Sequence, residues 1–308
     1  MSVVVCGEAM LLMLAEPGIP LERATAFRRS VAGAESNVAA GLARLGHEVR
    51  WIGRLGADPA GTSVLAMLRA DGIDTRHAVM DPYAPTGLLL RDSHPSRAID
   101  VQYYRAGSAA SRLSPGELAP GMVSGARLVH VTGITPMLSD SAHQATLRLL
   151  ELASEAGALI SFDPNIRLKL GPPDLWRERV APLMARADVV LAGADELELL
   201  QVDPAALDGL VVIKHRDKSA TCGGLRQEAF EVPVTDPVGA GDAFAAGFLS
   251  GLLRGLPYEV CLREAAAVAA LVVQCATDTD GLPDRAALDR ALAAFAAAKT
   301  GTGETVHR

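Results

Sequence analysis

Short apolar segments alternate with longer segments of helical periodicity along most of the chain, and this alternation limits the fold more than any other feature. Six apolar segments predict buried strands, at 3–6, 49–52, 128–131, 159–163, 189–192 and 210–213. Seven segments predict helices, at 37–45, 61–71, 139–156, 196–200, 242–254, 258–273 and 285–299. Strands that alternate with helices favour an α/β fold whose mostly parallel sheet is covered by helices on both faces.

Two stretches interrupt this alternation, at about 12–27 and 86–104. The second contains two strand-like segments, 88–90 and 99–104, with no helix between them, which predicts a small antiparallel sheet. We expect residues 1–299 to form one domain that includes these strands, and residues 300–308 to form a polar tail. Because ligands in such folds bind at the carboxyl ends of strands, we expect the turns at 7–8, 53–54, 132–133 and 163–165 to line a site.

The composition excludes several classes of partner. The net charge is -7 and no dense basic cluster is present, which argues against nucleic acid and anionic membrane surfaces. The first residues lack the pattern of a signal peptide, no apolar run approaches the ~20 residues of a membrane helix, and the four cysteines have no C-x-x-C spacing. We expect a reduced, cytoplasmic protein without a structural metal site.

The segment 236–242, Asp-Pro-Val-Gly-Ala-Gly-Asp, runs directly into an apolar helix. A glycine turn at a helix start gathers unpaired backbone N–H groups into a site for an anion, here from Gly239, Ala240 and Gly241. In a site that only binds phosphate, the carboxylate of Asp242 would repel the ligand. If phosphate is transferred, its carboxylate can accept a proton from the attacking hydroxyl. The alternative is a helix that merely starts with an acid and with glycines that ease packing.

A second glycine turn, at 33–46, opens a helix with a face of small residues. Together the two segments resemble the two signatures of the ribokinase-like (PfkB) family of sugar kinases. The resemblance implies a three-layer αβα sandwich with a small β lid that also makes a dimer contact. It further implies sugar binding by Gly33, Ala34 and Asn37, and catalysis by the glycine turn and Asp242.

Three further segments look like the branch of the family that contains 2-keto-3-deoxygluconate kinase: Gln102–Ala109, Val131–Pro136 and Phe162–Arg167. On this resemblance the sugar acid is bound by Tyr103, Arg105, Ile134, Arg167 and Asp278. A guanidinium suits a planar carboxylate, whereas a neutral sugar has no need of one. Taken singly, Arg105 is also explained as a residue on the surface of the lid, Arg167 as a turn cap and Asp278 as part of an acidic loop.

The nucleotide side is where the sequence departs from the family pattern. The resemblance assigns Asn165, Arg167, Lys214, Gly239 and Gly241 to ATP, and Glu196 to Mg²⁺ through water, but the Asn that usually precedes this Glu is absent. Arg216 and Ser219 replace the glycines of a family turn, which restricts the backbone. Arg216 or Lys218 then supplies a cation to phosphate, or the segment 214–219 is a solvated, charged hairpin.

The leading hypothesis is a kinase that uses ATP and Mg²⁺ to phosphorylate the terminal hydroxyl of 2-keto-3-deoxygluconate. A monovalent cation requirement and the oligomeric state stay open. One alternative keeps the chemistry and changes the acceptor to fructose, ribose or a nucleoside. Another is a sugar-binding protein that no longer turns over, which the altered 214–219 turn favours. A dinucleotide-dependent dehydrogenase fits poorly, because the first strand lacks a G-x-G-x-x-G turn.

Overall fold

A nine-stranded sheet forms the centre of the computed structural model, which describes residues 2–93 and 99–299. Its order is β13-β12-β11-β10-β9-β8-β1-β4-β5. The parallel part comprises β1 (Ser2–Cys6), β4 (Glu48–Gly56), β5 (Asp74–Asp81), β8 (Leu128–Thr132), β9 (Leu159–Asp163), β10 (Val189–Gly193) and β11 (Leu210–Lys214). Two short antiparallel strands, β12 (Ala220–Cys222) and β13 (Leu225–Gln227), complete one edge. The mostly parallel sheet expected from the alternation is confirmed.

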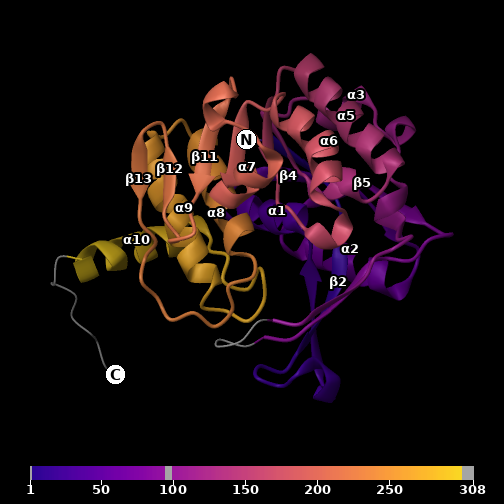
Figure 1. Cartoon of the computed structure of the whole chain (residues 1–308). Coiled ribbons are helices and arrows are strands. Elements are labelled where there is room, and N and C mark those ends of the chain that lie inside the picture. Colours follow the sequence, from indigo (N-terminus) through magenta and orange to yellow (C-terminus); the bar gives the residue numbers. More distant parts are fainter. Residues whose placement is uncertain (1, 94–98, 300–308) are drawn as a thin grey trace.

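Helices cover both faces of this sheet (Figure 1), and the alternation of side chains along each strand explains why. Val3 and Val5 point into one core with Trp51, whereas Val4 and Cys6 point into the other. The first core contains residues of α1 (Ala34–Arg44), α2 (Pro59–Ala70), α8 (Ala240–Leu253), α9 (Tyr258–Val272) and α10 (Arg285–Lys299). The second contains residues of α3 (Pro120–Val123), α4 (Ile134–Met137), α5 (Asp140–Glu155), α6 (Pro173–Met184) and α7 (Ala194–Leu200).

A second sheet of four strands, hereafter the lid sheet, lies below the large sheet in Figure 1. It is made of β3 (Phe27–Ala32), β2 (Met10–Ala15), β6 (Leu88–Arg91) and β7 (Val101–Tyr104), in that order. The two outer pairings are antiparallel and the central β2–β6 pairing is parallel. The small sheet predicted from the two interruptions is therefore present. The expected tail at 300–308 lies outside the described residues.

Several elements escaped prediction, and the composition of two of them, β5 and α6, explains why. β5 carries Arg76 and His77 and forms an edge of the sheet, where polar side chains are common. α6 contains two prolines, Pro173 and Pro182, which argue against a helix in the sequence. Pro173 is tolerated because it is the first helical residue, where a proline loses no hydrogen bond. The turn expected at 53–54 was wrong: Gly53 and Arg54 lie within β4, whose pairing with β5 continues to Gly56. None of the helices within the described ranges is long and apolar enough to span a bilayer.

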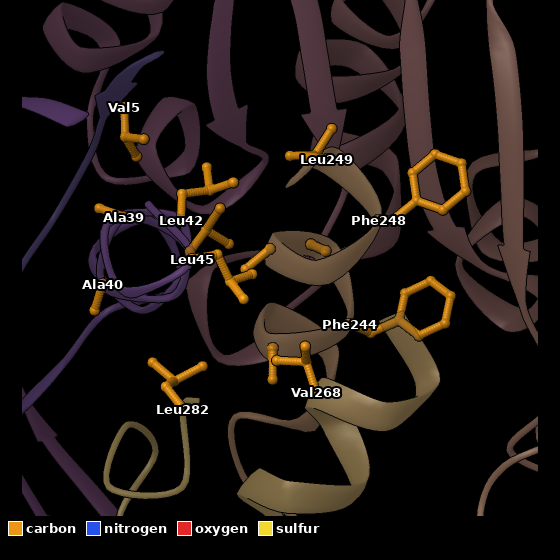
Figure 2. Close-up of a cluster of buried hydrophobic side chains, with 14 of the residues drawn as sticks. Val5, Ala39, Ala40, Leu42, Leu45, Phe244, Phe248, Leu249, Val268 and Leu282 are labelled. Atoms are coloured by element: carbon orange, nitrogen blue, oxygen red, sulfur yellow. The ribbon is translucent and has the colours of Figure 1, made fainter. Parts of the chain in front are cut away.

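The close packing of α1 on α8 brings the two glycine segments together (Figure 2). Small residues face one another at this contact: a Cβ at Gly41 would stand 2.6 Å from the Cβ of Ala246 and 3.3 Å from Cδ2 of Leu282. A contact of 2.6 Å is too short for two carbon atoms, so any side chain at position 41 would push the helices apart. The glycine thus allows the approach that places the start of α1 beside the start of α8.

We expect Gly41→Ala to lower the free energy of unfolding by about 1–3 kcal/mol, as overpacking of a core commonly does. Adding Ala246→Gly removes the opposing methyl group, so the double variant should recover most of the loss. Urea unfolding of the two variants checks this, with Ala294→Val on the exposed side of α10 as a control. A double variant that is as unstable as the sum of its two single changes would contradict the close contact.

Candidate active site

A cavity of about 420 Å³ lies at the carboxyl ends of the parallel strands, between the large sheet and the lid sheet. Residues from both signatures and from the lid sheet contribute to its wall. The sequence-predicted residues that line it are Gly33, Ala34, Asn37, Tyr103, Arg105, Ile134, Asn165, Arg167, Glu196, Lys214, Gly239, Gly241, Asp242 and Asp278. Residues more than 200 positions apart in the chain therefore share one site.

The glycine turn forms the start of α8 as the sequence predicted. Gly239 is the N-cap and adopts φ 83°, a left-handed conformation that favours glycine. Asp236 stabilises the turn because its Oδ1 accepts a hydrogen bond of 2.9 Å from the Val238 N–H. The first N–H groups of a helix have no partner within it. Beside Gly241 the space is open, and the nearest atom to a Cβ placed there is Nζ of Lys214 at 4.0 Å. The turn thus offers amides and a nearby cation to an anion.

Asp242 lies in the first turn of α8 and is hydrogen bonded to two carboxamides. Nδ2 of Asn37 donates to one of its oxygens at 2.8 Å, and Nδ2 of Asn165 donates to the other at 3.2 Å. Burial raises the pKa of Asp242 to about 7; the bond from Asn37 and the charge of Arg167 oppose the rise, while Asp163 and Asp278 add to it. A carboxyl group with a pKa near 7 is suited to accept and release a proton at neutral pH.

A second group of charges lies at the ends of β9, β10 and β11. Nζ of Lys214 donates to Oδ2 of Asp163 at 2.7 Å, and this carboxylate, with Glu196, holds the pKa of Lys214 above its ordinary value despite burial. The two oxygens of Glu196 accept the N–H groups of Ile166 and Gly193, each at 2.7 Å. Burial, followed by the nearby charge of Asp163, raises the pKa of Glu196. The arrangement is one of paired carboxylates beside a fixed cation.

Arg105 has a carboxylate partner inside the protein. Its Nη2 forms an ion pair with Glu8, which is 1% exposed and also accepts a hydrogen bond from Ser108. Burial raises the pKa of Glu8, and the charge of Arg105 works in the opposite direction. The expectation that a neutral sugar would leave both arginines without a carboxylate is therefore wrong for Arg105. The guanidinium also lies over the ring of Tyr103, 5.4 Å from its centre.

Arg167 differs from Arg105 in its surroundings. Its side chain is exposed and lines the cavity, and within the described ranges the protein provides it with no ion pair. Among the described residues, its one hydrogen bond is a donation from Nη1 to the carbonyl of Ile166, at 3.0 Å. The guanidinium lies close enough to Asp242 to lower the pKa of that carboxyl group. Arg167 therefore retains donors for a ligand near Asp242.

Some predicted residues do not line the cavity. Arg216 and Lys218 are exposed in the turn between β11 and β12, outside the residues that form its wall. The turn is closed by a hydrogen bond of 2.8 Å from His215 N–H to the Ser219 carbonyl. Residues 215–218 thus form a charged turn that is exposed at Arg216 and Lys218, whereas Lys214 precedes the turn in β11 and lines the cavity. Ala240 does not line the wall, and its N–H, predicted to be unpaired, donates to the carbonyl of Pro237 at 3.4 Å.

Sequence reasoning missed several charged residues of the wall. Glu8 and Asp163 lie in turns that were expected to line the site, but the sequence suggested no role for them, nor for Glu35 and Arg91. Glu35 is fully buried; its Oε1 accepts the hydroxyls of Thr132 and Thr135, at 2.8 and 2.7 Å. Arg91 is 1% exposed and pairs with both Asp236 and Asp278. A charge within an apolar strand segment such as 88–91 is the one signal that could have identified Arg91.

Comparison with known proteins agrees with this geometry. Residues 1–285 match the model of the pfkB family carbohydrate kinases. A 2-dehydro-3-deoxygluconokinase from Bacillus subtilis is 35% identical, with 100% of this chain and 98% of the relative aligned. A 2-dehydro-3-deoxygalactonokinase from Haloferax volcanii is 33% identical over 88% of this chain and 90% of its own. The crystal structure of the 2-dehydro-3-deoxygluconokinase from Thermotoga maritima superimposes with a TM-score of 0.89, at 24% identity, over 95% of this chain and 99% of its own.

Proposed function

Because the chain belongs to the pfkB family of carbohydrate kinases and is an ATP-dependent sugar kinase, we propose that its acceptor is 2-keto-3-deoxygluconate, also called 2-dehydro-3-deoxygluconate. The product is 2-keto-3-deoxy-6-phosphogluconate. The observation that carries the proposal is the exposed guanidinium of Arg167 in the same cavity as Asp242. A sugar acid supplies the carboxylate that this guanidinium lacks, and presents its terminal hydroxyl to the aspartate. The full-length relationship to the Bacillus subtilis kinase supports the same acceptor.

Asp242 acts as the general base in this proposal. It accepts the proton of the terminal hydroxyl as the oxygen attacks the γ-phosphorus of ATP and the bond from that phosphorus to the bridging oxygen breaks, which releases ADP. Asn37 and Asn165 hold the carboxylate in place. The amides at the start of α8 and the ammonium of Lys214 stabilise the negative charge on the transferring group. Asp242, Asn37, Asn165, Lys214 and Gly241 all line the same cavity.

Mg²⁺ supplies positive charge to the phosphates of ATP when it is bound. The described residues contain no cluster of three or more metal-binding side chains that would form a cage for it. Mg²⁺ commonly keeps several waters and takes only one or two protein carboxylates. Glu196 and Asp163 fit that pattern, because they lie together in the wall of the cavity and the oxygens of Glu196 are fixed by backbone N–H groups. We therefore assign Glu196 to water molecules of the bound ion.

A neutral sugar is the second candidate acceptor, and one observation favours it. The pair of Arg105 with Glu8 neutralises one of the two arginines, so only Arg167 remains to recognise an acid. Glu8, as a buried hydrogen-bond acceptor in the wall, also suits a hydroxyl-rich ligand. A protein that binds sugar without turnover is less well supported, because Asp242 and the amide turn are both in place.

A coupled assay of ADP release tests the acceptor. With MgATP, we expect turnover on 2-keto-3-deoxygluconate with a kcat/KM of at least about 10⁴ M⁻¹s⁻¹, a value at the lower end of ordinary enzymes. Gluconate, fructose and ribose should be poorer acceptors, and 2-keto-3-deoxygalactonate shows whether the site distinguishes the two stereochemistries. Preference for fructose or ribose would replace the proposed acceptor while leaving the kinase intact.

A further inference from the structure

Arg91 joins the lid sheet to the catalytic loops, although it comes from neither signature. It ends β6, where it pairs in register with Leu14 of β2 and Val101 of β7. Its side chain is 1% exposed, and its guanidinium forms ion pairs with Asp236 through Nη1 and with Asp278 through Nη2, the latter at 2.7 Å. A buried cation thus bridges two buried carboxylates that are 42 positions apart.

Each of these two carboxylate residues contacts the turn that precedes α8. Asp236 uses its other oxygen to accept the Val238 N–H, and so holds the turn that ends at Gly239. Asp278 packs on the same turn, because a Cβ at Gly239 would stand 2.9 Å from the carbonyl oxygen of Asp278. The amide turn is therefore held from two sides by the partners of one guanidinium.

Asp278 is also connected to Asp242, the proposed general base, through Asn37. Nδ2 of Asn37 faces two carboxylates, at 2.8 Å from Oδ2 of Asp242 and 3.5 Å from Oδ2 of Asp278. The position of Asp278 therefore influences where the amide of Asn37 points, and that amide orients Asp242. Without a cation beside Asp236 and Asp278, their buried charges would repel each other and move apart.

We propose that Arg91 is a positioning residue for phosphoryl transfer, which fixes the amide turn and Asp242 relative to the lid sheet through Asp236 and Asp278. This inference assumes the phosphoryl transfer of the proposed function, but it does not depend on which acceptor is phosphorylated. A guanidinium can bridge two carboxylates with a rigid fork, whereas a lysine ammonium acts as a single point of charge. Placement of the reacting groups within a fraction of an ångström has a large effect on rate, and this is what the bridge supplies.

The test compares Arg91→Ala, Arg91→Lys and Arg91→Met with the same three changes at Arg54. Arg54 is a matched control: it also bridges two carboxylates, Asp81 and Glu117, but it does not line the cavity. The assays use whichever acceptor the wild-type protein phosphorylates fastest. If the proposed acceptor is wrong, the wild-type assays show it, and the comparison of the variants is unaffected. We expect the Arg91 variants to lower kcat by about 100-fold with little change in the KM of either substrate. Arg54 variants should keep the wild-type kcat.

Two further measurements separate positioning from general stability. Guanidinium ion added to Arg91→Ala should restore part of its kcat, and the same addition should leave Arg54→Ala unchanged. Amide hydrogen exchange at 236–242, which needs no substrate, should become faster in Arg91→Ala and stay unchanged in Arg54→Ala. If folded Arg91→Lys and Arg91→Met keep the wild-type kcat, or if the exchange at 236–242 does not change, Arg91 is a purely structural residue and the proposal is wrong.

Discussion

Asp242→Asn is expected to lower kcat by about 10²- to 10⁴-fold, which is the usual contribution of a general base. Asparagine has nearly the same shape and can still accept the hydrogen bond from Asn37, but its NH2 group then faces the donor of Asn165. It cannot take the proton of the attacking hydroxyl. The amide turn is unaltered, so binding of MgATP should persist. The coupled assay measures the loss of turnover, and isothermal titration calorimetry measures the retained binding.

The pH profile is the control for the role of Asp242. Its pKa is raised from 3.8 to about 7, and the base works only when ionised, so wild-type kcat/KM should fall about tenfold per unit as pH drops below about 7. The same shift makes the folded protein lose stability as pH rises from 3.8 to about 7. Asparagine does not titrate, so the variant should not show this loss of stability between pH 3.8 and about 7. A variant that keeps a wild-type kcat would exclude Asp242 as the base.

Much of the fold follows from local sequence patterns. The central strands, such as β1 and β8, are buried on both faces and therefore read as continuous apolar runs. The main helices show periodicity that was sufficient to identify them, with ends displaced by one to a few residues. β5 could not be identified in this way, because its edge position allows polar side chains that break the apolar run.

The candidate site was predictable where a motif places several residues on one turn, and not where charges pair across the chain. The turn at 239–242 carries its chemistry locally, so its sequence was sufficient. Arg91, by contrast, pairs with residues 145 and 187 positions away, and Arg105 pairs with Glu8 over 97 positions. Only the fold brings such partners together. The pairing of Arg105 with Glu8 was missed because an arginine near a ligand site looks the same in sequence whether its partner is the substrate or the protein.

Arg167→Met should lower kcat/KM for 2-keto-3-deoxygluconate by about 10- to 100-fold, because a hydrogen-bonded charge pair with the substrate carboxylate is lost. Methionine keeps much of the apolar length and removes the charge. Arg167 also lowers the pKa of Asp242, so the acid limb of the variant's pH profile should move to higher pH. Coupled assays at several pH values measure both effects, with the exposed Arg263 of α9 changed to methionine as the control.

A comparison of acid and neutral acceptors shows which group Arg167 contacts. If the guanidinium binds the carboxylate of the sugar acid, the loss should be confined to acid acceptors, and the slow reaction with fructose or ribose should change little at pH values above the shifted acid limb. If it binds the phosphates of ATP instead, the KM for MgATP should rise and all acceptors should suffer alike. Equal losses on acid and neutral acceptors would therefore remove the main structural support for a sugar acid, since Arg105 already has Glu8 as its partner.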